Sequence, residues 1–413
     1  MDVRGKCYKG IGMYVLSMSY NFDDIIDRDP TNSSKWSLRK RIHGDEDIIP
    51  MWVADMDFAS PPAVVEAVKA RADHPIYGYT GVSDGYYEAF ISWMEKRNGW
   101  KIEREWMCFT PGVVTAIDVA VQAFTHPGDK VVIQPPVYYP FSSAVLNNGR
   151  QLVENHLKLE DNRYVMDYEG LEKKIDARTK MIVLCSPHNP IGRVWERSEL
   201  EKLVEVCAKK DILIVSDEIH SDLIIGKIKH TCIASISEDA ANRVITLMAP
   251  SKTFNLAGLK TSNIVIPNKK LREAFSNVLR NNGYGANIFG LTAAEAAYAE
   301  GEEWLDALLE YLRGNLKTLE DYLAEKIPEL RVFPVEGTYL PWIDCSGLNL
   351  DDPELNDLFL KKAKLWLDTG VMFGSGGSGF MRINIATPRS ILMKALGRLE
   401  NAVIEFRREK GTA

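Results

Sequence analysis

Five short, mostly apolar runs constrain the fold of this 413-residue chain more than any other feature of its sequence. Each run lies between turn-forming residues, and segments with helical spacing, such as 196–209, lie between the runs. This alternation is typical of buried parallel strands connected by helices that cover both faces of a sheet. We therefore expect an α/β domain with strands VVIQ (131–134), MIVLC (181–185), ILIVS (212–216), VITL (244–247) and NIVI (263–266).

Downstream of Pro328 the pattern indicates a second, smaller lobe. A face of Trp and Leu residues at helical spacing extends over 291–326, and we expect it to form one long bridging helix. Short strand-like and helical segments then alternate irregularly, which is typical of an α+β lobe. The expected elements are strands at 331–333, 338–343 and 380–386, helices at 352–368 and 388–406, and a Gly-rich loop at 374–379.

These patterns divide the chain into four expected parts. Residues 1–17 differ in character from the polar, helix-compatible run that Met18 opens, and Met18 is a candidate natural start. A polar stretch at 33–41 either contacts a partner subunit or is a solvated basic face, and the solvated face is the default expectation. The four parts are an extension at 1–17 that is not expected to be native, an N-terminal arm at 18–60 that joins the small lobe, a large domain at 61–300, and the bridging helix with a small C-terminal domain at 301–413.

Composition excludes several classes of function. The 50 Lys and Arg against 57 Asp and Glu give a net charge of −7, which disfavours binding to nucleic acid or to anionic lipid. The 6 Cys form no C-x-x-C pair, so we expect neither a structural zinc nor a disulfide framework. No stretch approaches the ~20 apolar residues of a membrane helix, and no signal-peptide core is found. We expect a cytoplasmic protein that binds a small molecule and no metal.

The segment APSKTFNLAGLK (249–260) carries the most informative lysine. It comes after the strand VITL, so Lys252 is expected at the carboxyl edge of the sheet, where ligands bind in open α/β folds. A lone lysine is more often a solvated surface charge. Here, however, Ser251 and Lys260 could supply a hydroxyl and a cation to one phosphate, which leaves Lys252 as an amine for a carbonyl cofactor.

Two further polar residues come after predicted strands at the same edge. Asn189 of SPHNPIG comes after MIVLC, and Asp217 of SDEIH comes after ILIVS. We expect their side chains to converge with Lys252, and a buried carboxylate there would need a cation such as a pyridinium nitrogen. Taken alone, Asp217 is equally well a helix N-cap, and Asn189 is equally well a turn residue before Pro190.

The segment TPGVVTAID (110–118) is expected to be a turn that opens a helix. Free backbone amides at Gly112, Val113 and Val114 would form an anion site suited to a phosphate. Taken alone, the segment is only a helix start.

Taken in order, these motifs resemble those of the fold type I pyridoxal 5′-phosphate (PLP) enzymes. The motifs are PGVV, PVYYPF, SPHNPIG, SDEIH, PSKTFN-x-AGL and G-x-G-F-x-RINIA. WVADMDF (52–58) and YGYTG (77–81) are similar to the cystathionine β-lyase, cystalysin and maltose-regulon modulator branch of the aminotransferase class I/II family. The resemblance covers about residues 20–408. It implies a fold type I transferase with a large mixed, mostly parallel sheet domain and a smaller α+β domain.

The resemblance also implies roles for five residues. Lys252 matches the lysine that binds PLP covalently, and Asp217 matches the carboxylate that keeps the pyridine nitrogen protonated. Asn189 matches the amide that donates to the phenolic oxygen of PLP. Tyr138 matches the ring that stacks on the cofactor, although a Tyr pair is more often core packing. Arg382 matches the arginine that binds the substrate α-carboxylate, whereas its sequence position alone favours a strand residue in a surface ion pair.

Four further positions are implied less directly. Tyr79 resembles the residue that reaches the phosphate of the neighbouring subunit's PLP, which implies a homodimer. Lys260 stands where many aminotransferases carry a phosphate-binding Arg, and it lacks the guanidinium fork. His220 stands where a Tyr is usual, and a core histidine is the competing interpretation. Tyr139 is a candidate to assist the leaving group or to shape the pocket.

The resemblance implies a carbon–sulfur β-lyase. Such an enzyme cleaves L-cystathionine, cysteine or other cysteine S-conjugates by α,β-elimination to a thiol, pyruvate and ammonia, with Lys252 as the base. One alternative is a PLP-dependent aminotransferase, which shares the early steps. Another is a catalytically competent regulator that docks a transcription factor.

Overall fold

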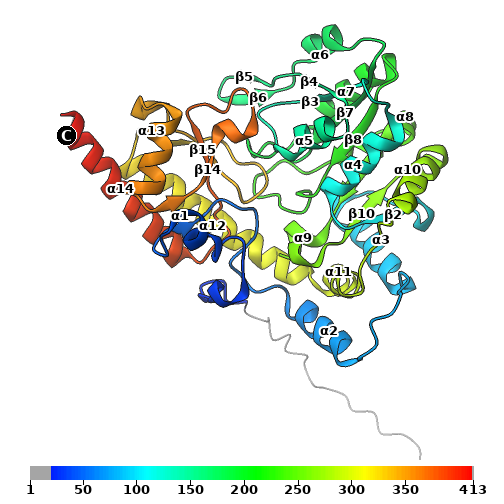
Figure 1. The fold of residues 1–413 in the computed structure, drawn as a ribbon, viewed down its shortest axis with the longest axis horizontal. Helices are drawn as coiled ribbons and strands as arrows, with labels where there is room; N and C mark the ends of the chain where they lie inside the picture. The colour runs from blue at the N-terminus through cyan, green and yellow to red at the C-terminus, as the bar shows by residue number, and fades with distance from the viewer. Residues whose placement is uncertain (1–19, 412–413) are drawn as a thin grey trace, which may run out of the picture.

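The computed structural model describes residues 20–411, and a seven-stranded sheet forms its centre (Figure 1). The strand order is β2-β10-β9-β8-β7-β3-β4. β10 is antiparallel to both of its neighbours, and all other pairs are parallel, which confirms the expected mixed, mostly parallel α/β sheet. The strands are β2 Met107–Thr110, β3 Lys130–Ile133, β4 Gln151–Glu154, β7 Thr179–Cys185, β8 Leu213–Asp217, β9 Val244–Met248 and β10 Ser262–Val265.

Central strands are buried on both faces because their residues alternate between two apolar layers. On β3, Val131 and Ile133 belong to one layer and Val132 to the other. Two-sided burial explains why these strands read as continuous apolar runs rather than alternating ones. One layer includes α4 Val113–Phe124, α5 Pro140–Asn147 and α10 Lys269–Asn281, and the other includes α2 Pro62–Asp73, α3 Asp84–Asn98, α6 Tyr168–Lys174, α7 Arg197–Lys209, α8 Glu238–Arg243 and α11 Ile288–Glu300.

A four-stranded antiparallel sheet forms the smaller lobe, in the order β11-β12-β15-β14. In Figure 1 the long helix α12 passes from this lobe toward α11 beside the large sheet. A short hairpin of β5 Lys158–Glu160 and β6 Arg163–Val165 lies outside both sheets. The elements of the small lobe are β11 Arg331–Val332, β12 Trp342–Asp344, β14 Asp368–Thr369, β15 Phe380–Arg382, α12 Glu302–Lys326, α13 Asp352–Asp357 and α14 Arg389–Lys410.

The single long helix expected over 291–326 is wrong, because two helices meet at Gly301. α11 ends at Glu300 and α12 begins at Glu302. A Cβ at Gly301 would lie 2.6 Å from Cε1 of Phe254 and 2.4 Å from the carbonyl oxygen of Ala297. The aromatic ring therefore presses against the backbone where the helix direction changes, and only glycine fits there.

The helix expected over 352–368 is also too long. α13 ends at Asp357, one π-helical turn continues to Lys362, and Lys364 has a φ of 57°. This left-handed residue ends the helical path, and the chain continues as β13 (Leu365–Trp366) and β14.

The expectation of a solvated basic face over 33–41 is wrong for its first half. Lys35 is fully buried, and its Nζ contacts Oδ2 of Asp57 at 2.7 Å. Trp36 Nε1 and Arg28 Nη1 donate to the other oxygen of Asp57 at 2.7 Å and 2.8 Å. Burial alone would raise the pKa of Asp57, but the charge and hydrogen bond of Lys35 hold that pKa below its usual range. This cluster anchors the segment 52–58.

The N-terminal arm is joined to the small lobe by a parallel strand pair. β1 (Ile49–Pro50) pairs with β13, and α1 (Leu38–His43) precedes it. Met18 and the extension at 1–17 lie outside the described residues. Between residues 20 and 411 no helix combines the length and apolar character needed to cross a bilayer.

Candidate active site

Three polar residues lie at the carboxyl ends of three adjacent strands. Asp217 is the last residue of β8, whereas Asn189 and Lys252 each lie four residues beyond the ends of β7 and β9. Because β7, β8 and β9 are neighbours in the sheet, these ends meet at one edge. The structure thus brings together the residues that the sequence motifs singled out.

Lys252 lies in the short helix α9 (Pro250–Thr253), and its Nζ donates to the carbonyl oxygen of Ala54 at 2.6 Å. Burial lowers the pKa of this amine to about 8, and the positive charges of Arg382 and Lys260 act in the same direction. The negative charges of Asp55 and Asp217 oppose them. About a tenth of the amine is therefore neutral at pH 7, the form that a nucleophile or base requires.

Asp217 is buried, and burial raises the pKa of its carboxyl to about 7. The hydrogen bond from the backbone N–H of Ile219 to Oδ1, at 3.1 Å, and the charge of Lys252 act in the opposite direction. A carboxylate in this environment is stabilised by a cation held against it.

His220 is buried on the same loop. Burial lowers the pKa of its ring to about 3, and the charges of Lys252 and Arg382 add to this effect. Its Nδ1 has no hydrogen-bond partner within residues 20–411. The ring is thus neutral, with a nitrogen free to contact a ligand, which does not match a core histidine whose polar atoms are all paired.

Arg382, on β15, is held from three sides. Its Nη1 donates to Oδ1 of Asn189 at 2.8 Å, and its Nη2 donates to the carbonyl oxygen of Trp52 at 2.8 Å and pairs with Asp368 on β14. The guanidinium carbon lies 4.8 Å from the ring centre of Phe373. Arg382 is buried, and its Nε has no partner in the described chain. The prediction of a surface ion pair, which the sequence position of Arg382 alone favours, is wrong, because the ion pair with Asp368 is buried.

Two tyrosines lie at the start of α5. Tyr138 is half-buried, and burial raises the pKa of its hydroxyl to about 12, with the neighbouring Tyr139 adding to the effect. The backbone N–H of Tyr138 donates to the carbonyl oxygen of Asn189 at 3.1 Å, which places Tyr138 beside the site. Tyr139 is 40% exposed, and its ring lies 6.4 Å from that of Phe373. Tyr138 is therefore a wall of the site, and Tyr139 is at its rim.

The beginning of α4 offers backbone donors. Gly112 is the N-cap and carries no capping side chain, so the amides of Val113 and Val114 are not consumed by a cap. A Cβ at Gly112 would meet nothing within 4 Å, which leaves open space beside these amides. Ser251 is half-buried and Lys260 is exposed, with a left-handed φ of 48°. The set suits a phosphate.

Tyr79 is the predicted site residue that the described chain does not bring to this edge. It is fully exposed, and it lies in an extended segment between α2 and α3. Ile76 and Tyr77 beside it are also more than half exposed, at 67% and 55%.

Sequence reasoning missed the contribution of the N-terminal arm. Ala54 accepts the hydrogen bond of Lys252, Trp52 accepts one from Arg382, and Asn384 Nδ2 donates to the carbonyl oxygens of Val53 and Asp55. The motif WVADMDF (52–58) was the available signal. It indicated the family resemblance, but it did not indicate that this segment contributes to the site. No sequence motif pointed to Asp368 or to Tyr339. The hydroxyl of Tyr339 also donates to the carbonyl oxygen of Ala54, at 3.1 Å.

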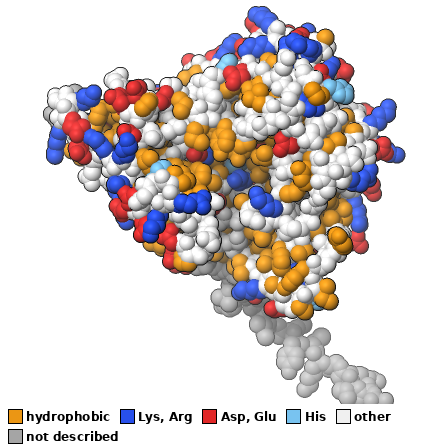
Figure 2. Space-filling view, in the orientation of Figure 1, with side chains coloured by type: hydrophobic (Ala, Val, Ile, Leu, Met, Phe, Trp, Pro, Cys, Tyr) orange, Lys and Arg blue, Asp and Glu red, His pale blue; other side chains and the backbone are white. Residues whose placement is uncertain are grey.

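Figure 2 shows the face on which the two sheets meet. Hydrophobic side chains gather around a hollow at the centre of this face, and a few basic side chains lie within it. An apolar wall with a small number of polar groups is typical of a site that binds a small ligand.

Comparisons with known proteins agree with this arrangement. The family model described as aminotransferase class I and II matches residues 46–399. A protein from Bacillus subtilis (strain 168), named cystathionine beta-lyase PatB, is 46% identical over 93% of this chain and 100% of its own length.

Two solved structures are similar across nearly the whole chain. Cystalysin from Treponema denticola, which contains a pyridoxal 5′-phosphate cofactor, has a TM-score of 0.91 and is 40% identical, covering 94% of this chain and 100% of its own. The PLP-bound C–S lyase from Staphylococcus hominis has a TM-score of 0.87 and is 35% identical, covering 94% of this chain and 98% of its own.

Proposed function

Because the chain belongs to the aminotransferase class I and II family, we propose that it is a PLP-dependent carbon–sulfur β-lyase. Its substrate is L-cystathionine, cysteine or another cysteine S-conjugate, and its products are a thiol, pyruvate and ammonia. Likeness to a cystathionine β-lyase and to a C–S lyase over 93% and 94% of the chain supports this reaction within the family.

The residues present fit PLP. Asp217 is a buried carboxylate without a cation of its own other than Lys252, and a protonated pyridine nitrogen would supply one. Lys252 offers an amine of lowered pKa to the aldehyde, and the open space beside Gly112 suits the phosphate. In the proposal the phosphate is bound by Gly112, Val113, Val114, Ser251 and Lys260. Tyr138 covers the ring, and Asn189 and His220 lie near its polar edge.

When bound, PLP supplies an electron sink that stabilises negative charge on the substrate α-carbon. Lys252 takes the proton from that carbon, since its pKa of about 8 leaves part of the amine neutral under physiological conditions. The electron pair of the broken C–H bond expels the sulfur from the β-carbon as a thiolate. Water then converts the three-carbon fragment to pyruvate and ammonia.

Arg382 orients the substrate. Its guanidinium is fixed by Asn189, Trp52 and Asp368, and its Nε has no partner in the described chain, so this nitrogen is left as a donor for the α-carboxylate. Tyr139 at the rim is proposed to shape the pocket around the leaving group.

We also propose a homodimer. The exposed Tyr79, with Ile76 and Tyr77, forms an aromatic and aliphatic surface that a second copy would cover. In such a dimer Tyr79 reaches the phosphate in the partner subunit, which accounts for its full exposure in its own chain.

The observation that carries the proposed reaction is the placing of Lys252, half-buried and with a lowered pKa, at the same sheet edge as the buried Asp217. The test is to incubate the PLP-loaded protein with L-cystathionine without a keto acid and to follow pyruvate and free thiol together. Equal accumulation of the two over many turnovers is expected. Turnover that requires a keto acid would instead identify an aminotransferase, and no turnover with any cysteine S-conjugate would favour the regulatory alternative.

A further inference from the structure

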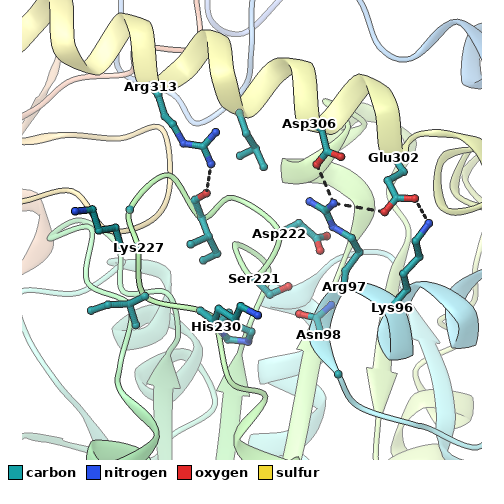
Figure 3. A pocket seen from close by; sticks show the side chains of 16 residues that line it. Lys96, Arg97, Asn98, Ser221, Asp222, Lys227, His230, Glu302, Asp306 and Arg313 are labelled. Carbon is teal, nitrogen blue, oxygen red and sulfur yellow. Dashed lines mark hydrogen bonds and ion pairs between the residues drawn. The ribbon is translucent and has the colours of Figure 1, made fainter. Parts of the chain in front are cut away.

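A second hollow of about 620 Å³ lies between α3, α12 and the loop at 221–230 (Figure 3). Ion pairs of Arg97 with Asp306 and Glu302 cross its upper part, and Lys96 also pairs with Glu302. Figure 3 shows Asp222 beside Ser221, facing Arg97. None of the residues that line this hollow is among those proposed to bind PLP or substrate.

Asp222 is a buried carboxylate with two specific donors. Thr253 Oγ1 donates to its Oδ2 at 2.9 Å, and Trp93 Nε1 donates to its Oδ1 at 3.1 Å. Burial raises the pKa of Asp222, while these hydrogen bonds and the charges of Arg97 and His230 act in the opposite direction. Burying a carboxylate costs solvation free energy, and the hydrogen bonds from the two donors offset this cost.

The two donors lie around the segment that carries Lys252. Thr253 is the next residue in the chain, and α9 has only four residues, so few hydrogen bonds within the helix fix it. Trp93 packs edge-on against Phe254, at 5.3 Å between ring centres. Asp222 therefore holds the residue after Lys252 directly and supports the ring beyond it through Trp93.

We propose that Asp222 is a positioning residue for Lys252, acting through the Thr253 hydroxyl from the side of α9 that faces the second hollow. The proposal rests on the proposed function only in that Lys252 binds PLP. With the hydroxyl bonded, α9 keeps the amine of Lys252 in its half-buried place, where it donates to the carbonyl oxygen of Ala54. Without that bond the helix loosens, water reaches the lysine nitrogen, and its charged form becomes less unfavourable.

The test compares Thr253→Val, which removes only the hydroxyl, with Thr253→Ser, which keeps it. The pH midpoint of the absorbance change of the PLP–lysine chromophore is measured in each holoenzyme, together with kcat and KM. For Thr253→Val we expect the midpoint to move to higher pH by about 0.5–1 unit. We also expect kcat to fall about tenfold with little change in KM, since the Arg382 contacts are untouched. Thr253→Ser is expected to restore all three values.

Two further variants separate positioning from general loosening. Asp222→Asn offers one acceptor oxygen to two donors and is expected to change the titration in the same direction as Thr253→Val. Tyr86→Phe removes another buried hydrogen bond of α3, from Tyr86 to Asn263 at 2.8 Å, and is expected to lower the melting temperature without moving the midpoint.

The proposal is overturned if Thr253→Val and Asp222→Asn titrate like the wild type. It is also overturned if Tyr86→Phe moves the midpoint as far as they do, since the effect would then be general loosening. Failure of the proposed function is a separate outcome. A protein that binds PLP through Lys252 but eliminates no thiol still allows the spectroscopic comparison, whereas a protein without the chromophore refutes both.

Discussion

Arg382 and Asn189, 193 residues apart in the chain, are joined by a hydrogen bond of 2.8 Å between Nη1 and Oδ1. The bond connects β15 of the small lobe with the loop after β7 of the large sheet. A group proposed to bind the substrate carboxylate is thereby fixed by a group proposed to contact the cofactor. The relative position of the two sheets is thus built into the site.

Replacing Arg382 by Lys keeps the positive charge and removes the guanidinium fork. The amine cannot contact Asn189, Trp52 and Asp368 and still bind a carboxylate. We expect KM for L-cystathionine to rise by about 10- to 100-fold with a smaller change in kcat, as loss of one or two charge-assisted hydrogen bonds implies. Steady-state assays of pyruvate release measure this. An unchanged kcat/KM would show that another residue holds the carboxylate.

Lys252→Ala removes both the proposed PLP anchor and the proposed base. We expect kcat to fall by at least about 1000-fold and borohydride treatment to leave no cofactor attached to the protein. Mass spectrometry of the intact chain measures the attachment, and pyruvate release measures turnover. Lyase activity that persists at the wild-type level would refute the mechanism.

Lys260 provides a matched comparison for Lys252→Ala. Its positive charge lowers the pKa of Lys252, but Lys260 is not proposed to bind PLP covalently. Lys260→Ala is expected to weaken PLP binding by about tenfold through loss of one charge-assisted contact to the phosphate. Lys260→Arg should retain the affinity or increase it. Titration of the cofactor-free protein with PLP, monitored by fluorescence, gives the dissociation constants. Equal affinities in all three proteins would exclude Lys260 from the phosphate site.

Five of the seven strands of the large sheet were predictable to within about two residues, because strands buried on both faces read as continuous apolar runs. The two edge strands, β2 and β4, were missed, and β4 is only partly buried. The break between α11 and α12 at Gly301 was not predictable from the sequence, because it depends on the ring of Phe254, 47 positions earlier in the chain. Local helical spacing continues across the break, and only the tertiary contact interrupts it.

The candidate site also has a part that was predictable from the sequence and a part that was not. Lys252, Asp217 and Asn189 come at or after strand ends, so their convergence was predictable from the sheet pattern. The partners that complete the site come from distant segments: Ala54 lies 198 residues from Lys252, and Trp52 lies 330 from Arg382. Asp368 reaches Arg382 only through the pairing of β14 with β15. No periodicity in the sequence encodes such contacts.

His220 gives a prediction about acid stability. Its ring has a folded pKa of about 3 against an ordinary value of 6.5, so it stabilises the fold above pH 6.5 and this contribution is lost as the pH falls toward 3. Asp217, with a folded pKa raised to about 7, acts in the opposite direction over pH 4–7, so the wild type alone does not isolate the effect.

The comparison is therefore with His220→Asn, which cannot titrate. Between pH 6.5 and pH 5 the wild type should lose about 1–2 kcal/mol of unfolding free energy relative to the variant. Urea unfolding of both cofactor-free proteins at the two pH values measures this difference. A difference that is independent of pH would mean that His220 is not buried in its neutral form.

The proposed dimer predicts complementation between two inactive variants. If each site combines Lys252 of one subunit with Tyr79 of the other, Lys252→Ala and Tyr79→Ala proteins each lack a working site. A mixed dimer then has one site with both residues intact and one with neither. After equal amounts are unfolded, mixed and refolded, half of the dimers are mixed, and activity should reach about one quarter of the wild-type value. Refolding each variant alone is the control. If the mixture remains as inactive as the separate variants although size-exclusion chromatography shows dimers, Tyr79 does not act across the interface.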